Sequence, residues 1–171
     1  MKIMIAGYSG SGKSTLARKL SSKYDIPVLH LDTVQFEEDW KVRSDEEKTE
    51  RIKDFLDSHD EWVIDGNYSR FFYERRAEEA DQIILLLFGR LSCLYRTFSR
   101  YLKYKGKSRP DMAEGCQEKF DFEFFTWILY GGRKKNSRER YRKLQERYPD
   151  KTVVIRNQKE LDSYKKKEGI S

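Results

Sequence analysis

The chain has 171 residues, which suits one domain with a real hydrophobic core. Charged and hydrophobic residues make up 37% each, a polar composition that is still globular. The net charge of +6 favours anionic partners: nucleotides, phosphorylated metabolites or nucleic acid.

The two cysteines, Cys93 and Cys116, form neither a metal-ligand spacing nor a disulfide framework, so we expect reduced thiols. The N-terminal run "MKIMIA" is too short for a signal peptide, and "DQIILLLF" is far too short to span a membrane. We therefore expect a cytoplasmic protein without a membrane partner, present as a monomer or a homodimer.

The first element is the apolar run "KIMIA" at 2–6, of strand length, followed by "GYSGSGKST" and an amphipathic helix start. The stretch fits the phosphate-loop pattern G-x-x-x-x-G-K-[ST], in which backbone N–H groups and a helix N-terminus surround an anion. Lys13 would reach the β- and γ-phosphates, and the Ser14 hydroxyl would bind Mg²⁺. The residues expected to hold ATP are Gly7, Tyr8, Ser9, Gly10, Ser11, Gly12, Lys13, Ser14 and Thr15.

Four more apolar runs follow, "IPVLHL" at 26–31, "WVID" at 62–65, "QIILLLF" at 82–88 and "TVVIR" at 152–156. They are near-continuous, which is typical of parallel strands buried on both faces. Helices are predicted between them at 43–59, with a capping box, at 92–104, at 121–148, where Gly131-Gly132 would kink the helix, and at 159–167. This alternation predicts an α/β fold whose ligands bind at the carboxyl ends of the strands.

Two aspartates follow strands at that edge. Asp65 ends the third strand, and we assign it with Ser14 to the metal shell; Asp32 follows the second, and we assign it to the acceptor substrate as a proton acceptor. Ordinary turn chemistry is the alternative for both. For His30, a satisfied buried histidine is favoured over a catalytic base.

No acidic residue occurs from Gln82 to Pro110. Arg96 and Arg100 lie four apart on one helix face, and a basic loop at 104–120 follows, which suits a lid that closes over phosphates. A nucleic-acid surface or a solvated face are the alternatives. The adenine is expected beside the basic helix and the 156–158 turn, with Arg96 and Asn157 as nucleotide contacts.

The phosphate loop, "LHLDTVQF", "WVIDGNY", "YKGKSRPDM" and "VVIRNQKEL" resemble the adenylate-kinase-like nucleotide and metabolite kinases of the P-loop superfamily. More closely, the whole chain resembles the bacterial DNA topology modulation proteins of the FlaR type. The resemblance implies ATP, Mg²⁺ and a three-layer α/β/α sandwich with a five-stranded parallel sheet in the order 2-3-1-4-5. It also implies one domain over 1–171, with a core at 1–103 and 121–171 and a helical lid at about 104–120.

By the same resemblance, "DGNYSR" takes the place of the adenylate-kinase "DGFPR" stretch. Asp65 and Gly66 match, the proline is missing and Arg70 is displaced by one position, which speaks against a nucleoside-monophosphate acceptor. Arg100, Arg109 and Arg133 would be the arginines of the lid.

The sequence therefore predicts a small phosphotransferase that uses Mg-ATP and an unidentified small-molecule acceptor. The alternative is a nucleotide-regulated DNA-binding protein that affects DNA topology, although the chain has no helix-turn-helix motif. A GTPase switch is disfavoured because the guanine-reading N-K-x-D motif is missing.

Overall fold

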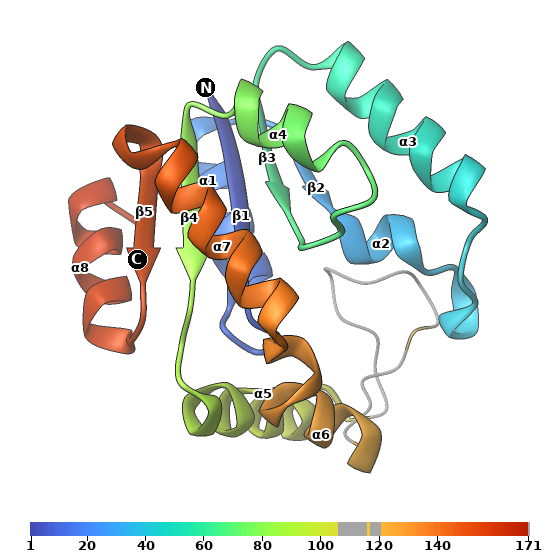
Figure 1. The fold of residues 1–171 in the computed structure, drawn as a ribbon, viewed down its shortest axis with the longest axis vertical. Coiled ribbons are helices and arrows are strands. Elements are labelled where there is room, and N and C mark those ends of the chain that lie inside the picture. The colour runs from blue at the N-terminus through green and yellow to red at the C-terminus, as the bar shows by residue number, and fades with distance from the viewer. Residues whose placement is uncertain (106–115, 117–120, 171) are drawn as a thin grey trace.

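The sheet has five parallel strands in the order β2-β3-β1-β4-β5, as predicted. The computed structural model describes residues 1–105, 116 and 121–170 (Figure 1). The strands are β1 (Lys2–Gly7), β2 (Val28–His30), β3 (Trp62–Asp65), β4 (Gln82–Leu86) and β5 (Thr152–Ile155).

Helices cover both faces of the sheet, as Figure 1 shows. Met4 and Ala6 of β1 face one layer and Ile3 and Ile5 face the other, because successive side chains of a strand point to opposite faces. The first layer contains α2 (Leu31–Gln35), α3 (Asp45–Ser58), α4 (Tyr73–Glu79) and α7 (Lys135–Arg147). The second contains α1 (Lys13–Tyr24), the start of α5 (Arg90–Tyr104), Ile128 of α6 (Phe122–Leu129) and α8 (Gln158–Glu168). None of the described helices is long and apolar enough to cross a bilayer.

The helix predicted at 121–148 is wrong in one respect, because it is broken rather than kinked. A 3₁₀ turn at Gly131–Arg133 separates α6 from α7. A Cβ atom on Gly131 would lie 2.6 Å from Cε3 of Trp127, so only glycine lets the chain turn against this indole.

The lid segment predicted at 104–120 lies mostly outside the described residues, and Arg109 lies outside them as well. Within this segment the structure describes Tyr104, which ends α5, the C-cap residue Lys105 and Cys116.

The capping box at the start of α3 is confirmed. The Glu47 N–H donates to Ser44 Oγ over 3.2 Å, and the Ser44 N–H donates to Glu47 Oε2 over 3.4 Å.

We expect Ser44→Ala to lower the free energy of unfolding by about 1 kcal/mol and Tm by about 2–4 °C. Ser58→Ala, at the other end of α3, is the control and should change Tm by less than about 2 °C. An equal Tm for Ser44→Ala and the wild type would contradict this role.

Candidate active site

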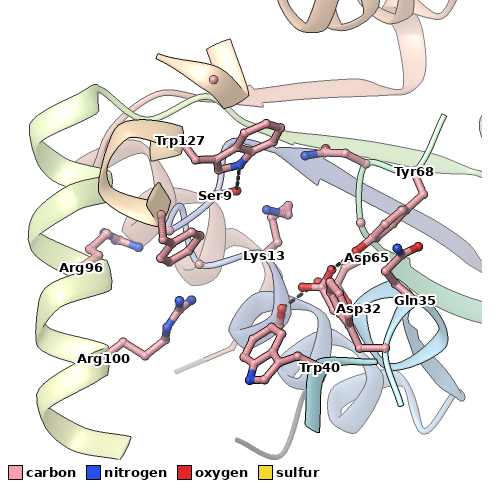
Figure 2. A pocket seen from close by; sticks show the side chains of 18 of the residues that line it. Ser9, Lys13, Asp32, Gln35, Trp40, Asp65, Tyr68, Arg96, Arg100 and Trp127 are labelled. Carbon is pink, nitrogen blue, oxygen red and sulfur yellow. Dashed lines mark hydrogen bonds between the residues drawn. The ribbon is translucent and has the colours of Figure 1, made fainter. Parts of the chain in front are cut away.

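A cavity of about 1560 Å³ opens at the carboxyl edge of the sheet. In Figure 2, Lys13 lies between two walls. Arg96 and Arg100 of α5 stand on one side, and Asp32, Gln35 and Tyr68 stand on the other. Ordinary small-molecule pockets measure roughly 300–1,000 Å³. The cavity is therefore large enough for a nucleotide and a second ligand beside it.

The phosphate loop is bent against its neighbours by close backbone contacts. Gly12 is the N-cap of α1 at φ 95°, and Gly10 has φ 77°, both in the region that glycine adopts easily. A Cβ atom on Gly10 would lie 2.3 Å from Thr97 Oγ1 and 2.6 Å from the Cys93 carbonyl oxygen. The loop therefore lies directly on α5, a contact that the sequence pattern did not predict for Gly10.

Asn67 braces the first residue of the loop and was missed by the sequence analysis. Its Oδ1 atom accepts from the Gly7 N–H over 3.0 Å, and its Nδ2 atom donates to the Gly7 carbonyl oxygen over 2.8 Å. The Tyr141 hydroxyl also donates to Asn67 Oδ1, over 3.1 Å. Asn67 follows Asp65 by two residues, so the polar stretch after β3 was the available signal.

Lys13 folds back onto the loop, where its Nζ donates to the Tyr8 carbonyl oxygen over 3.1 Å. Burial lowers the pKa of Lys13, and the Asp32 and Asp65 carboxylates act in the opposite direction. A phosphate group placed here would add the negative charge that this poorly solvated ammonium needs.

Ser14 and Asp65, the two residues predicted to bind Mg²⁺, lie in direct contact. The Ser14 hydroxyl donates to Asp65 Oδ2 over 2.8 Å, and the other oxygen of this buried carboxylate meets His30 Nδ1. Mg²⁺ commonly takes one or two protein oxygens and completes its shell with phosphates and water. A hydroxyl and a carboxylate are oxygen donors of the kind that this ion takes from a protein. The described residues contain no group of three acidic, His or Cys side chains that could hold a metal. His30 is buried and bonded, as the sequence analysis favoured.

Asp32 lies in α2, across the cavity from α5, and is held by a tyrosine that the sequence analysis missed. The Tyr68 hydroxyl donates to Asp32 Oδ1 over 2.7 Å. Burial, and then the Asp32 charge, raise the pKa of Tyr68, so the phenol stays protonated and keeps donating. The fully buried Arg76 donates to the Tyr68 carbonyl oxygen over 2.7 Å and fixes this segment from behind.

Two of the predicted arginines line the cavity, Arg96 and Arg100. Arg96 donates to the Ser11 carbonyl oxygen over 3.0 Å and stacks over the Phe88 ring at 4.4 Å. Burial lowers the pKa of Arg96. The phosphate loop and the basic face of α5 are thus physically connected.

Arg133 and Asn157 lie outside the lining of the cavity. Arg133 is buried, donates to the Phe88 carbonyl oxygen over 2.8 Å and stacks over the Tyr8 ring at 3.8 Å. Asn157 caps α8 by accepting from the Glu160 N–H over 3.0 Å. Arg133 therefore contacts the phosphate loop through the Tyr8 ring, and the predicted contacts of both residues to a nucleotide stay predictions.

A family model described as an AAA domain (AAA_18) matches residues 3–114. The chain belongs to this family. The structure of a shikimate kinase from Bacteroides thetaiotaomicron is similar, with a TM-score of 0.52 and 15% identity over 98% of this chain and 95% of that one. A gluconokinase from Sinorhizobium meliloti 1021 has 14% identity and a TM-score of 0.45, over 91% of this chain and 81% of that one.

No curated protein matches the chain significantly. The sheet order and the likeness to the shikimate kinase show the α/β fold of P-loop kinases. At 15% identity, the likeness to the shikimate kinase shows the fold alone.

Proposed function

We propose that the protein is a phosphotransferase that moves the γ-phosphoryl group of Mg-ATP to a hydroxyl group of a small molecule. One observation carries the proposal: Lys13, the Ser14–Asp65 pair and Asp32 line the same cavity. A nucleotide-binding protein that is only a switch would not need a second, carboxylate-bearing half of the cavity beside the phosphates.

The chemistry follows from where the side chains stand. The backbone N–H groups of the loop and Lys13 bind the β- and γ-phosphates, and Arg96 and Arg100 add positive charge from α5. Ser14 and Asp65 would hold Mg²⁺, which neutralises phosphate charge when bound. Asp32 receives the proton of the acceptor hydroxyl, and Tyr68 keeps its carboxylate in one orientation.

Arg96 and Arg100, which a nucleic-acid surface would also use, line the cavity, so a nucleotide phosphate is their simpler partner. The FlaR-type resemblance and an effect on DNA topology find no specific support in the described contacts. A cytoplasmic location and a monomer or homodimer stay predictions.

The metal assignment predicts the magnesium dependence of nucleotide binding. The wild type should bind ATP more tightly with Mg²⁺ than with a chelator, and Asp65→Asn should lower this gain by about tenfold or more, since an amide is a neutral and weaker ligand. Titration with a fluorescent ATP analogue measures both states. Asp45→Asn is the control, because Asp45 lines the same cavity but pairs with Lys48. An unchanged gain in Asp65→Asn would place the metal elsewhere.

The proposed function is tested by ADP formation with Mg-ATP across a panel of nucleosides, nucleoside monophosphates, sugars, sugar phosphates and duplex DNA. Acceptor-dependent ADP release that is lost in Lys13→Met supports the proposal. ADP release stimulated only by DNA would favour the nucleotide-regulated DNA-binding protein instead.

A further inference from the structure

The turn between α2 and α3 holds two side-chain-bearing residues in the left-handed region. Asp39 has φ 57° and Trp40 has φ 64°. Such a conformation is a genuine outlier for a bulky residue, and it persists only where the surroundings enforce it. Strain of this kind concentrates at binding and catalytic sites, so Trp40 is a candidate for a ligand-binding residue.

The surroundings do enforce it. Phe36 and Val42 form an antiparallel bridge across the turn, and the Glu37 N–H donates to the Lys41 carbonyl oxygen over 2.7 Å. Arg43 Nη1 donates to three carbonyl oxygens at the end of α2, those of Thr33, Val34 and Phe36, at 2.8, 3.0 and 3.1 Å. The turn is therefore pinned at both of its ends.

This turn presents an aromatic surface to the cavity. The Phe36 and Trp40 rings pack edge to face with centroids 5.2 Å apart, and both line the cavity. In Figure 2, the Trp40 indole lies below Lys13, between Arg100 and Asp32. Aromatic faces of this kind bind the faces of ligand rings by stacking.

The polar groups beside the indole restrict which substituents a ligand ring can have at this place. Asp32 Oδ1 is taken by the Tyr68 hydroxyl, which leaves Oδ2 for a donor on the ligand, and the Gln35 amide lines the same wall. A carboxylate repels anions and accepts from hydroxyl or amino groups.

The nearby cations Lys48 and Arg70 are both paired with Asp45, at 2.6 and 3.7 Å. This carboxylate offsets one of their two positive charges. With the Asp32 carboxylate in the same lining, the charges of these four groups balance, which favours an uncharged ligand beside them.

We propose that the Asp32 half of the cavity binds a neutral, hydroxyl-bearing ring compound, a sugar or a nucleoside, with its ring on Trp40 and its reactive hydroxyl on Asp32. This inference rests on the proposed function and names its acceptor. In the transfer, the hydroxyl oxygen forms a bond to the γ-phosphorus and the bond from that phosphorus to the β–γ bridging oxygen breaks. ADP leaves, and the hydroxyl proton passes to Asp32.

The test measures binding rather than turnover. Isothermal titration calorimetry on the full chain, with Mg²⁺ and a non-hydrolysable ATP analogue present, compares neutral sugars, nucleosides, and the phosphate esters of both. We expect a neutral ring compound to bind and Trp40→Gly to weaken it by about tenfold or more. The same variant should keep the affinity for the ATP analogue and a Tm near that of the wild type, because glycine removes the backbone strain.

Asp39→Gly is the matched control, since it relieves the neighbouring strained residue but leaves the indole in place. It should raise Tm and keep the affinity for the ring compound. Binding of a sugar or of a nucleoside that is weakened in Trp40→Gly supports the proposal. The compound that binds then shows which of these two classes the site takes.

Three results would overturn the inference while the proposed function stands. The first is tighter binding of the phosphate esters than of the neutral compounds, which would point to Arg140 in the lining. The others are an equal affinity of wild type and Trp40→Gly for the ring compound, and no binding of any neutral ring compound while the ATP analogue binds. Failure of the ATP analogue itself to bind would overturn the proposed function.

Discussion

Replacing Asp32 by Asn is expected to lower kcat by about 10²–10⁴-fold, the usual contribution of a positioned general base. The amide keeps the shape of the side chain and can still meet the Tyr68 hydroxyl, which lies 2.7 Å from Asp32 Oδ1, but it cannot take a proton from the acceptor. The affinity for Mg-ATP should change by no more than about threefold, because Asp32 stands across the cavity from the α5 arginines. Steady-state kinetics with the acceptor found by the panel measure the effect.

Tyr68→Phe separates the orientation of Asp32 from its basicity. It removes only the hydroxyl that donates to Asp32, so we expect a loss in kcat of about tenfold, well below that of Asp32→Asn. Asp57→Asn is the control and should keep kcat near the wild-type value, because Asp57 pairs with Arg75 outside the lining of the cavity. A wild-type kcat in Asp32→Asn would show that another group takes the proton.

Replacing Gly10 by Ala is expected to damage both stability and nucleotide binding. The new Cβ atom would lie 2.6 Å from the backbone oxygen of Cys93 in a chain held at φ 77°, so the loop or α5 must shift. We expect a loss of about 3 kcal/mol in the free energy of unfolding and of about 6–12 °C in Tm. ATP affinity should fall by about tenfold or more, since the N–H groups of the loop lose their alignment.

Gly89→Ala is the matched control for this prediction. A Cβ atom on Gly89 meets nothing within 4 Å, and its φ of −60° suits any residue. Its Tm should stay within about 3 °C of the wild type. Thermal unfolding and ATP titration of the two variants measure the changes in Tm and in ATP affinity. An unaltered ATP affinity in Gly10→Ala would mean that the loop does not bind phosphate through this backbone.

The nucleotide half of the cavity was predictable because its determinants are local. The stretch from Gly7 to Thr15 is contiguous, follows an apolar strand and opens a helix, so one short pattern specifies it. The strands were predictable for a similar reason, since each is a short, mostly apolar run. The three central strands β1, β3 and β4 are almost fully buried, whereas β2 and β5 at the sheet edges are largely half-buried. Asp65 could be placed beside the loop because parallel strands end at one edge.

The acceptor half was not predictable in the same way. Tyr68, Gln35 and Trp40 come from segments without a periodic pattern, and they meet only when α2, the following turn and the stretch after β3 pack together. Charge alone was also a poor guide for arginine. Arg96 lines the cavity, whereas Arg133 is buried and stacks on Tyr8 of the loop. Nothing in the local sequence of Arg133 distinguishes a buried cation from a lid residue.

The most direct test of the account is the fate of the γ-phosphorus. Phosphorus NMR of the protein with Mg-ATP and neutral sugars or nucleosides follows each product as it forms. The account predicts a phosphate monoester resonance that grows in step with ADP and is lost in Lys13→Met. Growth of inorganic phosphate alone, at a rate independent of every acceptor, would contradict it, because the second half of the cavity would then have no part in the reaction.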